Sequence, residues 1–177
     1  MIVLCRHAAT EVNLAMRFLS TTDAPLGERG LEQSAALREA LGPYTFERCL
    51  VSPMRRCLQT RAIVAPDLPF EIEPGLREVS FGSWEGLSAD EVEAVTPGAI
   101  AERRAAPAAF RPPGGESIED AAARLRPIAE RLMQMQRTLV IGHRIALGIL
   151  ERLLRDHPLD SQGVIGLSPA EFRIVRE

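Results

Sequence analysis

Short apolar runs that stop abruptly at polar residues are the main pattern along the chain. They cover residues 1–5 (MIVLC), 48–52 (RCLVS) and 138–142 (TLVIG). Apolar residues without alternation favour strands that are covered on both faces, as in a parallel sheet between two layers of helices. A shorter run at 69–73 (PFEIE) predicts a further strand, and residues 163–176 predict two strands joined by a turn, as a hairpin at one sheet edge.

Five segments carry helical spacing or a helix-start signal, and we expect helices over residues 31–41, 52–65, 88–95, 145–154 and from 117 onward. Ser52 followed by Pro53 is a strong start signal, because serine caps helices and proline fits the first helical position. The long helix begins with a capping-box pattern at Ser117 and contains Pro127, which should kink or split it. The proline-rich residues 97–115 predict an irregular connection.

Alternating strands and helices predict a single α/β domain over residues 1–177, with three α/β/α layers and a mainly parallel central sheet. Hydrophobic residues at 46% and charged residues at 25% are typical of a globular protein. No apolar stretch approaches the roughly 18 residues that span a bilayer, so we expect no membrane association. Cys5, Cys49 and Cys57 lack paired short spacing, which favours buried free thiols in a cytoplasmic protein over disulfides or a metal site.

The charged residues narrow the possible ligands. A net charge of -3 argues against a nucleic-acid partner held by a basic surface. All 21 basic side chains are arginine, which excludes a lysine-based phosphate loop and a lysine Schiff base. Arginine still binds phosphate or carboxylate with two parallel hydrogen bonds, so we expect any anion site to be local.

The three longest apolar runs each lead into groups that can bind an anion: Arg6 with His7, Ser52 with the nearby Arg56, and His143 with Arg144. Because the carboxyl ends of parallel strands share one sheet edge, we expect these groups to converge there. A role as simple strand caps is the alternative. Two histidines without a third ligand are a poor zinc set, and neighbouring arginines would repel a cation, so we expect no metal.

Six motifs, in the same order along the chain, resemble those of the histidine phosphatase superfamily, the group that includes the cofactor-dependent phosphoglycerate mutases. RHAATEVN resembles its arginine-histidine-glycine signature, and VSPMRRCLQT resembles its Ser-Pro-x-x-Arg helix start. LREVSFGSWEG is similar to its acid-bearing loop and VIGH to the strand before its second histidine. DAPLGERGLEQS and PPGGES are similar to the segments that precede two of its helices.

The resemblance implies a phosphoglycerate mutase-like fold and a role for each matching residue. His7 is the expected nucleophile, which takes the phosphoryl group as a phosphohistidine; Arg6, Arg56 and His143 form the phosphate pocket, and Glu78 is the general acid. We also expect substrate contacts from six further residues: Thr10, Asn13, Arg17, Ser52, Glu116 and Arg144. Ala8 and Arg144 replace two family glycines, and either could narrow the pocket or change substrate choice.

The expected activity is metal-independent hydrolysis of a small phosphate ester, with no cofactor. The resemblance leaves two alternatives: a cofactor-dependent phosphoglycerate mutase, and a weakly active or non-catalytic phosphate-binding homologue. A mutase must shield its intermediate from water, and little chain between Gly86 and Gly115 is available for that purpose. The closing hairpin could supply an edge for a homo-oligomer.

Overall fold

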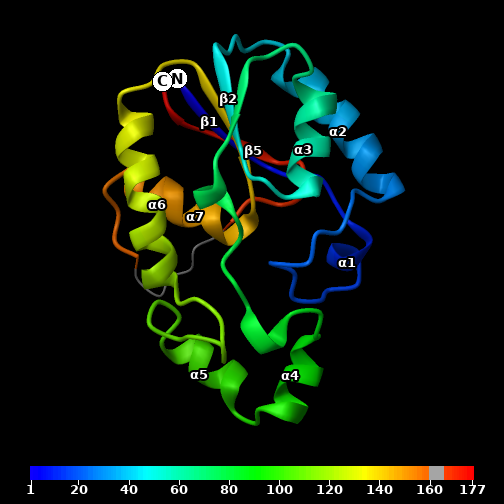
Figure 1. The fold of residues 1–177 in the computed structure, drawn as a ribbon, viewed down its shortest axis with the longest axis vertical. Helices are drawn as coiled ribbons and strands as arrows, with labels where there is room; N and C mark the ends of the chain where they lie inside the picture. Colours follow the sequence, from blue (N-terminus) through cyan, green and yellow to red (C-terminus); the bar gives the residue numbers. More distant parts are fainter. Residues whose placement is uncertain (160–165) are drawn as a thin grey trace.

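The computed structural model describes residues 1–159 and 166–177, and its centre is a five-stranded sheet in the order β3-β2-β4-β1-β5 (Figure 1). The strands are β1 (Ile2–Arg6), β2 (Arg48–Val51), β3 (Phe70–Ile72), β4 (Thr138–Gly142) and β5 (Phe172–Arg176). The first four run parallel in their pairings, and β5 pairs antiparallel with β1 at one edge. The mainly parallel sheet is therefore confirmed.

Helices cover both faces of this sheet. They are α1 (Glu11–Leu14), α2 (Glu28–Leu41), α3 (Arg55–Val64), α4 (Ala89–Val95), α5 (Ala99–Ala105), α6 (Ile118–Met133) and α7 (Arg144–Leu154), with single 3₁₀ turns η1 (Pro74–Leu76) and η2 (Gly82–Trp84). Figure 1 shows α6 and α7 on one side of the sheet, α2 and α3 on the other, and α4 and α5 beyond its lower end. This arrangement confirms the three-layer α/β/α fold.

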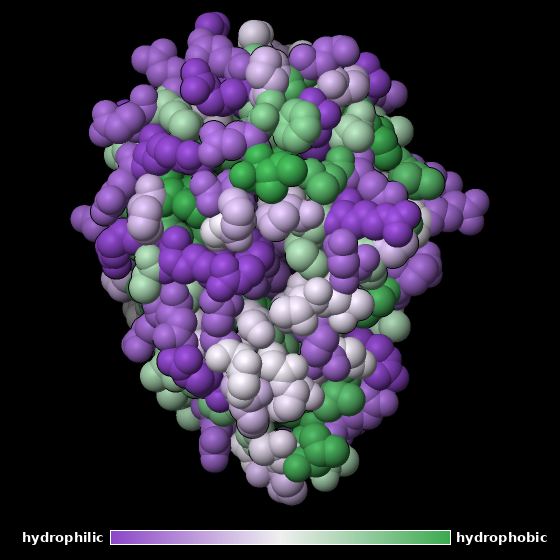
Figure 2. Space-filling model, in the orientation of Figure 1, coloured by the Kyte–Doolittle hydropathy of each residue, from purple (hydrophilic) through white to green (hydrophobic). Residues whose placement is uncertain are grey.

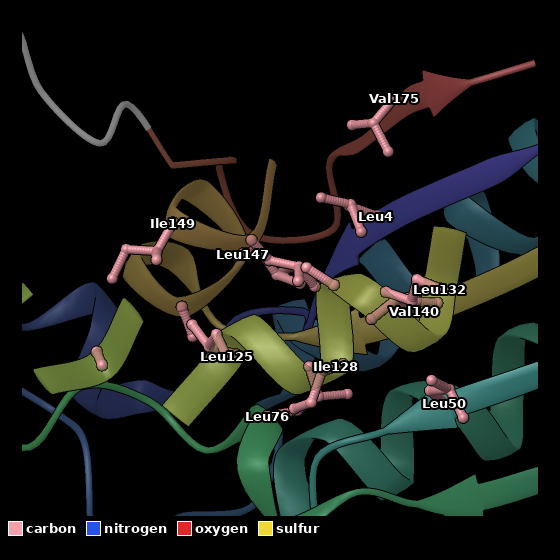
Figure 3. Close-up of a cluster of buried hydrophobic side chains, with 14 of the residues drawn as sticks. Leu4, Leu50, Leu76, Leu125, Ile128, Leu132, Val140, Leu147, Ile149 and Val175 are labelled. Atoms are coloured by element: carbon pink, nitrogen blue, oxygen red, sulfur yellow. The ribbon is translucent and has the colours of Figure 1, made fainter. Parts of the chain in front are cut away.

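Alternate side chains of each strand pack into two separate hydrophobic cores, because successive side chains point to opposite faces of the sheet. Leu4 and Val140 pack with α6 and α7, and Figure 3 shows Leu125, Leu132 and Leu147 of those helices around them. The neighbouring strand residues face α2 and α3, in the cluster of Val3, Cys5, Cys49, Val51, Leu139 and Ile141. Burial on both faces explains why these strands carry no polar alternation.

The strand register brings the polar strand ends to one edge. Arg6 pairs with Gly142 in the β1–β4 ladder, and Val51 pairs with Ile141 in the β2–β4 ladder. The backbone N–H of His7 then donates to the carbonyl of Gly142 at 3.0 Å. The residues that follow β1, β2 and β4 therefore meet at the carboxyl edge, as predicted.

A third, smaller hydrophobic cluster supports α4 and α5. It consists of Phe81, Trp84, Val92 and Ala99, with Phe18, Leu87, Ile100, Phe110 and Ile145 packed against it. Gly82 in η2 has a φ of 53°, and a Cβ there would lie 2.2 Å from the carbonyl oxygen of Pro113. Glycine is thus required where this loop passes the backbone of residues 113–115.

Three sequence expectations differ from the structure. Helix α3 begins at Arg55, after the cap residue Met54, and Ser52 does not cap it. Residues 97–115 contain the regular helix α5, which the proline content had obscured. Helix α6 is continuous through Pro127, so the predicted split is wrong; its capping box at Ser117 is confirmed.

The predicted closing hairpin is only partly described. Its second strand is β5, which lies at the sheet edge as expected but pairs with β1. Its first strand lies mostly outside the described residues, and Gly166 and Leu167 belong to no strand.

The surface is mostly hydrophilic on the face shown in Figure 2, and the three cysteines are buried. Figure 2 shows a largely hydrophilic face, with residues of intermediate hydropathy gathered over its lower half. Within the described ranges, no helix has the length and apolar character needed to cross a membrane. Cys5, Cys49 and Cys57 are buried free thiols, and burial raises the pKa of Cys57 to about 12.

Candidate active site

His7 lies directly after β1 and is only 2% exposed. Its Nδ1 is 2.7 Å from the carbonyl oxygen of Ala8. Because a carbonyl only accepts hydrogen bonds, Nδ1 carries the ring proton and Nε2 keeps a free lone pair. The imidazole is therefore held in the tautomer that a nucleophile at Nε2 requires.

Two buried arginines flank this ring. Arg56 donates to the carbonyl oxygens of Thr22 at 2.8 Å and Ser20 at 2.9 Å. Arg6 donates to the carbonyl oxygen of Leu167 at 2.9 Å, while its Nε is buried without a partner among the described residues. Burial lowers the pKa of Arg6 to about 10.

Neither of these guanidinium groups forms an ion pair with a carboxylate of residues 1–159 or 166–177. Glu78 acts on both groups only through space, and a buried cation without a directly bonded carboxylate favours the binding of an anion. A phosphoryl group has the charge and the acceptor oxygens to fill this role.

His143 precedes α7 and lies beside His7, with ring centroids 5.1 Å apart. Its Nδ1 accepts a hydrogen bond from Nε of Arg56 at 3.3 Å, so its Nε2 donates to the hydroxyl of Ser52 at 2.8 Å. Burial, reinforced by the positive charges of Arg56 and Arg6, holds the pKa of both histidines well below the usual value. Both rings are accordingly neutral.

Glu78 approaches from the loop after η1 and is 7% exposed. Its Oε1 accepts from the backbone N–H groups of Val79 at 2.9 Å and Ala146 at 3.0 Å, and its Oε2 accepts from Ile145 at 3.2 Å. The carboxyl group thus lies at the amino terminus of α7, with both oxygens held by backbone N–H groups.

A cavity of about 480 Å³ opens over this site. Its polar walls include four arginines and a single carboxylate, and they are formed by Arg6, Arg17, Arg103, Arg144, Glu78 and Asn13. His7, Arg56 and His143 lie behind these walls, buried beneath the surface. With four arginines and one carboxylate among its lining residues, the cavity is positively charged.

The remaining sequence candidates occupy different places. Thr10 is buried as the cap residue of α1, and Asn13 completes its capping box while also lining the cavity. Arg17 lines the cavity too, but its guanidinium is paired with Glu91 at 2.6 Å. Arg144 lines the cavity from the first turn of α7.

Ser52 and Glu116 do not line this cavity, although Glu116 lines a second cavity beside it. Ser52 is buried behind His143, to which it is hydrogen-bonded. Glu116 accepts hydrogen bonds from Arg77 and Arg124 and from the backbone N–H of Ser80. Their predicted substrate contacts remain predictions, and in this arrangement both side chains have protein partners.

Ala8 is also outside the cavity wall. It is fully buried, and its backbone N–H donates to the hydroxyl of Thr60 at 3.1 Å.

Sequence reasoning missed Arg103. This side chain comes from α5 and lines the cavity, with its guanidinium 5.5 Å from the ring centroids of Phe18 and Phe81. The only signal was a pair of arginines in the segment of residues 97–115, whose helix was not expected.

Sequence reasoning also missed the role of Glu85. Its carboxylate accepts from the backbone N–H groups of Ser20 and Thr22, each at 2.9 Å, and from the hydroxyl of Ser20. The carbonyl oxygens of the same two residues accept from Arg56. Glu85 therefore fixes the loop of residues 20–22, whose carbonyl groups in turn position the guanidinium of Arg56.

Comparison with known proteins identifies the family. The histidine phosphatase superfamily (branch 1) matches residues 2–176. A glucosyl-3-phosphoglycerate phosphatase of Mycolicibacterium vanbaalenii is 32% identical over 178 residues, covering 93% of this chain and 78% of the relative. A 2,3-bisphosphoglycerate-dependent phosphoglycerate mutase of Methylobacterium radiotolerans is 34% identical, covering 87% of this chain and 78% of the relative.

A solved structure shows the same fold. The mycobacterial glucosyl-3-phosphoglycerate phosphatase in complex with VO3 superposes with a TM-score of 0.87 at 29% identity, covering 97% of this chain and 90% of that one. The chain therefore belongs to branch 1 of the histidine phosphatase superfamily.

Proposed function

We propose that this chain is a phosphoric monoester hydrolase that acts on a small phosphorylated metabolite through a phosphohistidine on His7. The observation that carries the proposal is the free Nε2 of His7 beside two buried arginines that form no ion pair with a carboxylate of the described residues. A phosphoryl group bound there would be neutralised by Arg6 and Arg56 while His7 attacks it. Charge neutralisation and positioning are the main requirements of phosphoryl transfer, and arginines can supply both.

In the first step, Nε2 of His7 attacks phosphorus as the bond to the substrate oxygen breaks. Glu78 gives a proton to the departing alkoxide. We assign this proton to Oε2, because its single hydrogen bond to Ile145 is the longest of the three that the carboxylate accepts. Oε1 stays bound to Val79 and Ala146 and holds the group in place.

In the second step, water attacks phosphorus and the phosphorus–nitrogen bond breaks. Glu78, now a carboxylate, accepts a proton from the water, and inorganic phosphate leaves. His7 returns to its neutral form with Nδ1 still donating to the carbonyl of Ala8. The cycle restores both groups, and no other co-reactant than water is needed.

The test uses purified protein with a panel of phosphorylated metabolites: sugar phosphates, phosphoglycerates, glucosyl-3-phosphoglycerate and ribazole phosphate. Release of inorganic phosphate is measured with a chelator present. We expect turnover of at least one ester, and we expect His7→Ala to abolish it while circular dichroism and the melting temperature stay close to wild type. Undiminished turnover by a folded His7→Ala protein would refute the mechanism.

A mutase is the second candidate, because one relative at 34% identity is a bisphosphoglycerate-dependent mutase. A mutase would interconvert 2- and 3-phosphoglycerate only when primed with a bisphosphate. Incubation of the protein with 3-phosphoglycerate, with and without 2,3-bisphosphoglycerate, distinguishes the two activities. Release of phosphate without isomerisation favours the hydrolase.

A further inference from the structure

A second cavity of about 460 Å³ adjoins the one over His7. Its walls are mostly apolar and include Phe110, Ile100 and Ile118, and its charged lining residues are Arg103, Arg104 and Glu116. The two cavities share Phe18, Phe81, Arg103 and Ile145 as lining residues. They are therefore neighbours across a common wall, with the phosphoryl site at one end and an apolar chamber at the other.

Arg103 marks this common wall. Its guanidinium is 5.5 Å from the ring centroids of both Phe18 and Phe81, within the range of a cation–π contact. In the described part of the chain it forms no hydrogen bond or ion pair. Partial burial lowers its pKa, and the nearby Glu78 acts in the opposite direction. A polar linker passing between the cavities would satisfy this group.

The apolar chamber has no counterpart in the reaction at His7. Phosphoryl transfer needs charge neutralisation, an acid and water, and none of these is served by Phe110, Ile100 or Ile118. Apolar walls gain free energy by removing apolar ligand surface from water. The chamber also lies beside the cavity that Glu78 lines, where the alcohol of the ester, the part that varies between substrates, would leave.

We propose that this second cavity binds the apolar end of the substrate's alcohol, so that the preferred esters carry an alkyl or aryl group attached to the phosphate by a linker that passes Arg103. This inference rests on the proposed hydrolase function and names the substrate class for the same site. Each methylene that enters the chamber should raise kcat/KM about fourfold, the effect of burying one CH₂ group. Methylenes that lie in the charged cavity should contribute less.

The test compares a series of alkyl phosphates from methyl to octyl, together with 1-naphthyl phosphate. Ala89 lines only the second cavity, at the exposed start of α4, so Ala89→Phe should fill the chamber without disturbing the core. We expect the ratio of kcat/KM for octyl over methyl phosphate to fall at least tenfold in Ala89→Phe. Ala94→Phe is the matched control, because Ala94 is exposed on the same helix and lines neither cavity.

Direct binding separates this inference from the proposed function. Calorimetry with the His7→Ala protein measures the affinity for octyl and methyl phosphate without turnover. Tighter binding of octyl phosphate, lost on adding Ala89→Phe, supports the chamber even if no alkyl ester is hydrolysed. Equal affinities, or a chain-length preference that Ala89→Phe leaves intact, would overturn the inference, while hydrolysis of short esters alone would still support the hydrolase.

Discussion

Nε of Arg56 donates a hydrogen bond to Nδ1 of His143 across 3.3 Å, and both side chains are almost fully buried. The bond forces His143 to carry its proton on Nε2, which donates to Ser52. Arg56 also holds the carbonyls of Ser20 and Thr22, so one guanidinium orders three chain segments around the phosphoryl site. A planar group with five donors can do this, and a lysine ammonium cannot.

Arg56→Lys should therefore lower kcat/KM by about 100-fold, the usual effect of losing one preorganised donor at a phosphoryl or acyl site. The positive charge is kept, so the loss reports geometry. Arg55→Lys is the matched control, because Arg55 is the exposed neighbour on the same helix turn. Steady-state kinetics with a common substrate measures both. A similar loss in the two variants, or none in either, would contradict the role of Arg56.

The two neutral histidines predict a pH dependence of stability. Burial and the nearby arginines hold the pKa of His7 and His143 well below the usual value. Below about pH 6.5 the two histidines therefore bind protons in the unfolded chain but stay neutral in the folded chain. The free energy of unfolding falls as the pH decreases below about 6.5. Each histidine contributes up to about 1.4 kcal/mol per pH unit, and above about pH 6.5 their contribution is constant.

Urea unfolding between pH 5 and pH 8 measures this slope. His7→Ala removes one of the two groups, so the free energy of unfolding should fall less steeply below pH 6.5 in that variant. An unchanged slope would show that His7 binds protons equally in the folded and the unfolded chain, which would contradict a lowered pKa of His7 in the folded protein.

Glu78→Gln should discriminate between leaving groups. An alkyl alcohol needs a proton as it departs, whereas 4-nitrophenolate leaves without one, so the first step should slow by about 100-fold or more only for alkyl esters. With 4-nitrophenyl phosphate, the loss of the base in the second step should produce a burst of nitrophenol followed by slow turnover. Stopped-flow absorbance and the melting temperature of the variant are measured together. Equal losses for both esters, with no burst, would assign the proton to another group.

The sheet and its active edge could be predicted from sequence, because strands buried on both faces carry a local apolar signal. The ends of such strands carry Arg6, His7 and His143. The register of β1 with β4 places these residues together. The start of α3 could not be predicted, since the hydroxyl of Ser52 bonds to His143, 91 residues away in the sequence. That tertiary contact takes the side chain that would otherwise cap the helix.

The residues that line the cavities are brought there by tertiary contacts, which no local sequence pattern predicts. Helix α5 is only 7 residues long and lies between prolines, and Ala99 and Ile100 stabilise it by packing on the cluster around Trp84. Arg103 lines the cavity because α5 packs on this cluster, beyond the lower end of the sheet (Figure 1). The contacts of Glu85 could not be predicted from sequence either, since its partners Ser20 and Thr22 are more than 60 residues away in the chain.

Glu85 gives the last prediction. Although burial opposes it, the hydrogen bonds from Ser20 and Thr22 lower the pKa of Glu85, so the carboxylate is charged and accepts from both residues. Both backbone N–H groups donate to Oε1, which a glutamine keeps, but a glutamine has no second acceptor oxygen for the Ser20 hydroxyl and carries no charge. The loop should then loosen and release the carbonyls that orient Arg56.

Glu85→Gln should weaken inhibition by orthovanadate about tenfold, because the loss of one charge-assisted hydrogen bond contributes roughly 1.5 kcal/mol and acts on the anion through Arg56. Inhibition constants and melting temperatures are measured beside Glu102→Gln, a control that removes an exposed carboxylate on α5. A merely structural role would lower the melting temperature and leave the inhibition constant unchanged, and that result would contradict the link from Glu85 to Arg56. Partial recovery of vanadate inhibition in Glu85→Asp would strengthen it, since the shorter carboxylate keeps both acceptor oxygens.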